Sequence, residues 1–171
     1  RRVLERYRLT PPDAIARHLA DPSAETPKPE DPRLARTGGA VIATARSALN
    51  AAAEAARASG VEPLILGDAI EGEAREVAKD MAERALAIRR ESKPRGAPCV
   101  LLSGGETTVT VTGKGQGGRN SEFLLALARA LEGAPGIYAL AADTDGIDGV
   151  ADNAGAIIRP DSLARARAAA L

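Results

Sequence analysis

The sequence predicts an α/β fold, with a three-layer, mostly parallel sheet and flanking helices, preceded by a helical segment and a proline-rich linker. From Gly38 onward, short apolar runs alternate with amphipathic stretches, which is the order produced by parallel strands joined by helices. The run 98–103 is too apolar to have a face in water, as is typical of strands covered on both sides. Residues 21–36 carry prolines among charged residues, and proline disfavours regular structure.

The N-terminal segment is expected to contain a helix over residues 11–20. Thr10 is a suitable N-cap, Pro11 suits the first turn, and Ile15 and Leu19 fall on one face. Residues 1–37 are therefore interpreted as a helical segment and linker from a preceding domain, and residues 38–171 as a C-terminal α/β domain.

Within the α/β domain, the apolar pattern predicts alternating strands and helices. Strands are expected at 40–44, 62–67, 98–103, 107–112 and 136–142, and helices at 46–59, 71–91 and 121–132. Gly60 is expected just past the end of the first of these helices, and the run 93–96 is expected to end the second. Residues 162–171 read as an unfinished helix, so the domain is expected to be truncated at its end.

Composition argues against several classes of function. The chain has 171 residues, with 23 Lys and Arg against 23 Asp and Glu, and 2% aromatic residues. A neutral balance and so few aromatic rings argue against nucleic-acid binding. No apolar run approaches the roughly 20 residues that span a bilayer, which argues against a membrane partner. The single cysteine, Cys99, is expected to be inert in a buried strand and fits a cytoplasmic protein.

Three polar loops follow predicted strands, where ligands bind in open α/β sheets. The first is Ser103-Gly104-Gly105-Glu106. Gly104 and Gly105 would let the backbone approach a ligand closely, and Glu106 could pair with a cation. The alternative is an ordinary tight turn.

The second loop, residues 113–122, contains four glycines before a predicted helix start. Backbone N–H groups at such a start can bind an anion, and Lys114 and Arg119 add positive charge. The spacing of Gly113, Gly115 and Gly118 formally matches the dinucleotide fingerprint, although the preceding strand is not a buried one. A flexible loop without a ligand is the alternative.

The third loop, residues 143–153, carries four aspartates directly after a predicted buried strand. Clustered carboxylates repel one another unless a cation is near, so they favour a Mg²⁺ site or a base for a hydroxyl group. Asp-Gly turns with a helix cap are the alternative. Together, a cationic glycine-rich loop and a carboxylate cluster suit phosphoryl transfer.

These loops resemble one known family when they are taken together. The runs 99–111, 117–122 (Gly-Gly-Arg-Asn-Ser-Glu) and 142–149 (Ala-Asp-Thr-Asp-Gly-Ile-Asp-Gly) are similar to the MOFRL domain of the glycerate 2-kinase family, many of whose members are labelled hydroxypyruvate reductase. The MOFRL-like part covers about residues 97–171. The resemblance implies ATP- and Mg²⁺-dependent phosphorylation of D-glycerate to 2-phosphoglycerate, in a cleft that an N-terminal domain of the same protein completes.

The resemblance also implies roles for individual residues. Arg119 would stabilise the charge on the transferred phosphoryl group, and Asp145 would orient or deprotonate the glycerate hydroxyl. The residues expected to bind the nucleotide are Gly104, Gly105, Lys114, Gly115, Gly117, Gly118 and Asn120. The expected metal ligands are Glu106, Asp143 and Asp148.

Two other functions stay open at this point. One is a hydroxypyruvate reductase that binds NAD(P)H through residues 113–118. The other is a non-catalytic module that binds a phosphorylated ligand. Because the N-terminal domain of the family is absent from this chain, the chain alone is expected to be inactive.

Overall fold

The computed structural model describes residues 2–91, 98–150 and 152–170. The chain divides into two compact units, Arg1–Ile42 and Ala43–Leu171, and each is described here by itself. The predicted break at residues 93–96 lies outside the described residues.

The first unit is built from short helices: α1 (Arg2–Tyr7), α2 (Asp13–Ala20) and the 3₁₀ turns η1 (Pro22–Ala24) and η2 (Pro32–Leu34). The predicted helix over residues 11–20 starts later than expected, because Pro12 has extended backbone and is the N-cap in place of Thr10. The linker is also less extended than predicted. Asp21 and Asp31 each accept a hydrogen bond from the backbone N–H two residues on, and each starts a turn.

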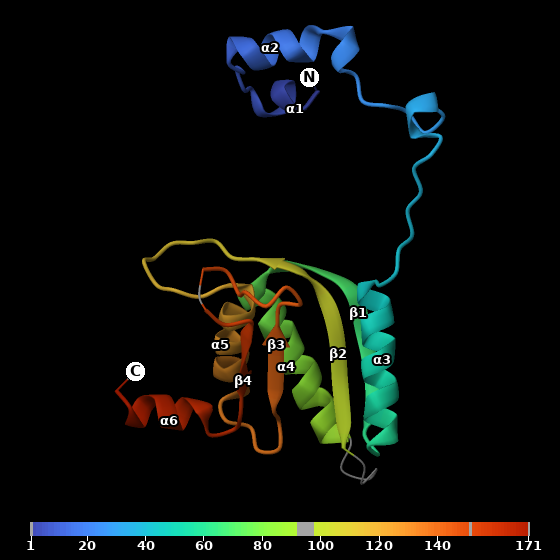
Figure 1. Cartoon of the computed structure of the whole chain (residues 1–171). Coiled ribbons are helices and arrows are strands. Elements are labelled where there is room, and N and C mark those ends of the chain that lie inside the picture. The colour runs from blue at the N-terminus through green and yellow to red at the C-terminus, as the bar shows by residue number, and fades with distance from the viewer. Residues whose placement is uncertain (1, 92–97, 151, 171) are drawn as a thin grey trace. The chain divides into compact units, whose positions relative to one another are not determined.

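The second unit has mixed α/β structure, with a parallel sheet and flanking helices, which confirms the predicted class. Its elements are α3 (Ala45–Ala58), β1 (Glu62–Glu73), α4 (Ala74–Glu91), β2 (Cys99–Thr108), α5 (Arg119–Leu131), β3 (Ala139–Ala142), β4 (Gly155–Ile158) and α6 (Ser162–Ala168). β1 and β2 pair in parallel, whereas β3 and β4 form an antiparallel pair. Figure 1 shows α3 on one side of the β1–β2 pair and α4 on the other.

Local chemistry explains the bounds of α3. The Oγ1 of Thr44 accepts a hydrogen bond from the N–H of Ser47 (3.1 Å), and the N–H of Thr44 donates to the Oγ of Ser47 (2.8 Å). This reciprocal capping satisfies two backbone donors that the helix start leaves free. After the helix, Gly60 adopts φ +73°, as predicted.

The strand predicted at residues 40–44 is wrong. Val41 and Ile42 are almost fully exposed and have no regular structure. β-branched residues favour a strand only where a neighbouring strand accepts their backbone hydrogen bonds, and among the described strands β1 pairs with β2 alone. Cys99 is likewise exposed rather than buried, because it is the first residue of β2 and lies at the end of the sheet.

The predicted loop at residues 103–106 lies inside a strand. β2 runs without interruption from Cys99 to Thr108, and Glu106 pairs with Glu71 of β1. It therefore includes only the first two residues of the strand predicted at 107–112, and residues 109–112 have no regular structure. Two adjacent glycines usually mark a turn, but here the register of the pair shifts beside them. A Cβ at Gly105 would collide with the backbone of Ile70, so only glycine fits this close approach.

The strand predicted at residues 136–142 is shorter and less buried than expected. It is limited to β3, and Tyr138 and Leu140 are exposed. β4 had no predicted counterpart, because four residues carry too little periodicity to be recognised as a strand. The antiparallel pairing of these two short strands makes residues 143–154 the loop that joins them.

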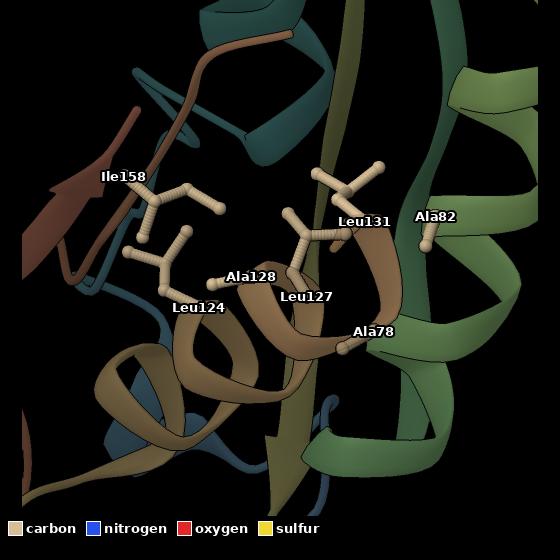
Figure 2. Packing of buried hydrophobic residues seen from close by; sticks show 7 residues of the cluster. All are labelled: Ala78, Ala82, Leu124, Leu127, Ala128, Leu131 and Ile158. Atoms are coloured by element: carbon tan, nitrogen blue, oxygen red, sulfur yellow. The ribbon is translucent and has the colours of Figure 1, made fainter. Parts of the chain in front are cut away.

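The core lies between α4, α5 and β4. Figure 2 shows Leu124, Leu127 and Leu131 of α5 between the small residues of α4 and Ile158 of β4. Ala78 and Ala82 are buried, and because their side chains are small, α5 can pack closely against α4. This packing holds the start of α5 beside the loop after β3. In the described part of the chain, no helix combines the length and hydrophobicity that crossing a membrane requires.

Candidate functional site

Arg119, the first residue of α5, lies between two carboxylates. Its Nη2 and Nε donate to the Oδ1 and Oδ2 of Asp143 (2.6 and 3.3 Å), and its Nη1 donates to the Oε1 of Glu106 (2.7 Å). The hydrogen bonds to Asp143, followed by the one to Glu106, raise the pKa of Arg119 above its ordinary value. The guanidinium is therefore charged, and the two-point contact with Asp143 orients its plane.

The two carboxylates differ in exposure. The side chain of Asp143, directly after β3, is 12% exposed, whereas that of Glu106, on β2, is 79% exposed. Asp143 is thus a fixed partner of Arg119. Glu106 pairs with Arg119 from the solvent side, where an ion pair contributes little and another anion can replace it.

Asp148 is buried, with 0% exposure, and its carboxylate caps the start of α5. Its Oδ1 accepts from the backbone N–H and the side-chain amide of Asn120 (2.9 and 3.2 Å). Its Oδ2 accepts from the backbone N–H and the Oγ of Ser121 (2.8 and 2.6 Å). Burial alone would raise the pKa of Asp148, but the hydrogen bonds from Ser121 and Asn120 lower it below its ordinary value. The carboxylate therefore faces the positive end of the helix as an anion.

The loop after β3 and the start of α5 also meet through Asn120. Its side-chain amide donates to the Oδ2 of Asp143 (2.9 Å) as well as to Asp148. Asp143 and Asp148 thus hold the same helix start, one through the guanidinium of Arg119 and the other through the backbone.

The expected metal ligands are Glu106, Asp143 and Asp148. Among residues 2–91, 98–150 and 152–170, no group of three or more His, Cys, Asp or Glu side chains could hold a metal ion. The oxygens of Asp148 already accept hydrogen bonds from protein donors. The metal role of these residues stays a prediction.

The expected nucleotide-binding residues lie in three places. Gly104 and Gly105 lie in β2, and Lys114 and Gly115 lie in the exposed segment between β2 and α5. The third group, directly before or within the first turn of α5, consists of Gly117, Gly118 and Asn120. Backbone N–H groups at this helix start were expected to bind an anion, and two of them, those of Asn120 and Ser121, already donate to Asp148.

Asp145, the expected base, lies in an exposed turn. Its Oδ1 accepts a hydrogen bond from the N–H of Ile147 (3.2 Å). This short-range contact presents the carboxylate at the surface of the loop, two residues beyond Asp143. Its catalytic role stays a prediction.

Glu73 holds the segment after β2 in place, and sequence reasoning missed it. The N–H and Oγ1 of Thr110 donate to its two carboxylate oxygens (both 3.0 Å). The backbone hydrogen bond from Thr110 is the leading cause of a lowered pKa for Glu73. Two residues so far apart in sequence give no local signal of their contact.

Gly149 provides a test of how closely the loop after β3 packs on the start of α5. It has φ +72°, and a Cβ there would collide with the carbonyl oxygen of Gly117. Gly146 in the same loop has φ +91° with nothing within 4 Å of a Cβ. Gly146→Ala should therefore cost about 1 kcal/mol for its backbone conformation alone. Gly149→Ala should cost about 3 kcal/mol, because a collision is added. Urea unfolding compares the two variants, and equal losses would contradict the close packing.

Comparison with known proteins shows which family part of the chain matches and which proteins the chain is similar to. Residues 99–171 match the model of the MOFRL family. A protein from Agrobacterium vitis with the provisional name hydroxypyruvate reductase is 50% identical over 173 residues, which cover 99% of this chain and 38% of that protein. A D-glycerate 2-kinase from Thermotoga maritima is 34% identical over 157 residues, which cover 92% of this chain and 36% of that protein.

The crystal structure of a glycerate kinase from Thermotoga maritima has the same fold. It superposes with a TM-score of 0.77 at 31% identity, covering 99% of this chain and 39% of that one. The chain thus spans well under half the length of these relatives. The matched region contains the cluster formed by Glu106, Arg119, Asp143 and Asp148. Residues 99–171 are thus a MOFRL region, and nearly the whole chain is similar to part of the glycerate 2-kinases.

Proposed function

We propose that the full-length protein containing this chain is a kinase that transfers the γ-phosphoryl group of ATP to the 2-hydroxyl of D-glycerate. The observation that carries this proposal is the oriented guanidinium of Arg119, held by partly buried Asp143 and paired with exposed Glu106. A D-glycerate 2-kinase and a glycerate kinase structure among the relatives support the choice of reaction.

Arg119 suits the stabilisation of phosphoryl charge because its orientation is set before a ligand arrives. An incoming phosphate would replace Glu106, whose exposed ion pair contributes at most about 1 kcal/mol. Asp143 would keep the guanidinium in place during this exchange. Preorganised charge of this kind is the main means by which enzymes stabilise a phosphoryl transition state.

Asp145 is the proposed base. The glycerate hydroxyl would lose its proton to Asp145, its oxygen would bond to the γ-phosphorus, and the bond from that phosphorus to the bridging oxygen of ADP would break. The N-terminal domain of the full-length protein is proposed to complete the site around these groups. The chain alone is therefore expected to lack activity.

Mg²⁺ is proposed to arrive with the phosphates of ATP. It commonly binds one or two carboxylates together with phosphate oxygens and waters. The described residues alone do not fit a resident metal site, because no three suitable side chains converge. No step proposed here depends on a metal held by this chain.

The test is a kinase assay of the full-length protein with ATP and D-glycerate, with the product identified by ³¹P NMR. The expected product is 2-phosphoglycerate. Oxidation of NADH with hydroxypyruvate, and no phosphoryl transfer, would favour the reductase instead. Binding of phosphorylated ligands without either reaction would favour a binding module.

The reductase has less support in the site. A dinucleotide fingerprint binds pyrophosphate through the N–H groups of a helix start. In α5 the N–H groups of Asn120 and Ser121 already donate to the buried carboxylate of Asp148.

A further inference from the structure

We propose that Asp148 is the positioning residue for Arg119: it holds the first turn of α5 so that the guanidinium keeps its orientation. The effect of this positioning on catalysis rests on the proposed kinase function. The structural part of the proposal concerns this chain alone and is tested separately below.

The start of α5 has no cap of its own. Its N-cap residue is Gly118, which has no side chain to accept the N–H groups of the first turn. Asp148, contributed by the loop after β3, accepts the N–H groups of Asn120 and Ser121 instead. The helix start therefore depends on a residue far away in the sequence.

The capped turn leads directly to the guanidinium. Arg119 immediately precedes Asn120, whose side-chain amide joins Asp148 to Asp143. Asp143 in turn holds the Nε and Nη2 of Arg119. A shift of the helix start would move both the backbone of Arg119 and the amide that supports its carboxylate partner.

The loop that carries Asp148 is itself anchored. The N–H of Asp148 donates to the carbonyl of Asn153 (2.7 Å), and the N–H of Asp143 donates to the carbonyl of Ala154 (2.7 Å). Both aspartates are thus tied to the chain entering β4. A change in the position of β3 and β4 would consequently move Asp148 and, through the start of α5, Arg119.

The first experiment uses Asp148→Asn in the full-length protein. The asparagine keeps the shape but turns an amide N–H group toward backbone or hydroxyl donors that need an acceptor. We expect kcat to fall between about tenfold and a hundredfold, because a misplacement of about 1 Å has effects of this size, while KM changes less. In an Arg119→Lys background the same change should add little further loss. A merely structural role would lower kcat by equal factors in both backgrounds and would overturn the proposal.

The second experiment does not need activity. In ¹⁵N NMR spectra, Asp148→Asn should shift the Nε–H signal of Arg119 and speed its hydrogen exchange. Ser121→Ala, which removes one donor to Asp148, should act in the same direction with a smaller effect and serves if Asp148→Asn does not fold. Thr44→Ala, which removes the cap of α3, is the control for lost stability and should leave the signal unchanged.

The outcomes separate the two proposals. An unchanged Arg119 signal in Ser121→Ala and in any folded Asp148→Asn protein overturns the positioning role, whatever the activity. A shifted signal in the variants, together with an unmutated full-length protein that does not phosphorylate glycerate, supports the positioning role and refutes the proposed function.

Discussion

Replacement of Arg119 by alanine in the full-length protein is expected to lower kcat for phosphoryl transfer by about 10²–10³-fold. The reason is that Arg119 is the cation which Asp143 orients in advance at this site, with two hydrogen bonds of 2.6 and 3.3 Å. Without it, charge on the transferred phosphoryl group loses a preorganised partner. The measurement is steady-state kinetics with ATP and D-glycerate, corrected for the folded fraction at the assay temperature.

Arg46→Ala is the matched control for this prediction. Arg46 forms the same kind of two-point pair with Asp68, through its Nε and Nη2 (3.0 and 2.7 Å), but it belongs to α3. Its removal should change kcat by less than about twofold, because partly exposed ion pairs contribute little. Arg119→Lys, which keeps the charge but loses the two-point contact, should give an intermediate loss. Near-normal turnover in Arg119→Ala would remove Arg119 from the mechanism.

Leu124→Ala is expected to cause the largest loss of stability. Leu124 is 1% exposed and packs with α4 and β4 in the cluster of Figure 2. Truncation in such a site removes buried surface and leaves a cavity, with a cost of about 2–5 kcal/mol. Urea unfolding followed by circular dichroism measures this cost as a lower midpoint with an unchanged slope.

The neighbouring residue provides the control. Leu125 follows on the same helix and is 56% exposed. Leu125→Ala should therefore change the free energy of unfolding by about 0.5 kcal/mol, and alanine favours the helix in both variants equally. Similar losses in the two variants would show that α5 does not bury the face described here.

The helices followed from local signals more closely than the strands did. The cap at Thr44 and the left-handed Gly60 bound α3 close to the predicted residues, because both signals act within a few positions of the helix. The strands needed partners that the sequence does not specify. Residues 40–44 have the composition of a strand, but no strand in the described part of the chain pairs with them. The glycines in β2 are accommodated by a register shift against β1.

The candidate site, too, could be predicted from the sequence only in part. The sequence indicated which loops carry the polar chemistry, and the structure joins them at Arg119. The structure also places Asp148, which was expected to bind a metal, buried at the start of α5. A carboxylate can bind a metal, accept a proton or cap a helix, so its type alone does not decide among these roles.

The sequence by itself determined the class of fold, the approximate helices and the family motifs, because these depend on residues close together along the chain. Only the tertiary structure decided that Arg119 pairs with Asp143 and Glu106, and that Asp148 caps a helix whose own N-cap is glycine. The physical reason is that hydrogen bonds and burial depend on neighbours in space. The partners of these carboxylates became neighbours only when β2, the loop after β3 and the start of α5 packed together.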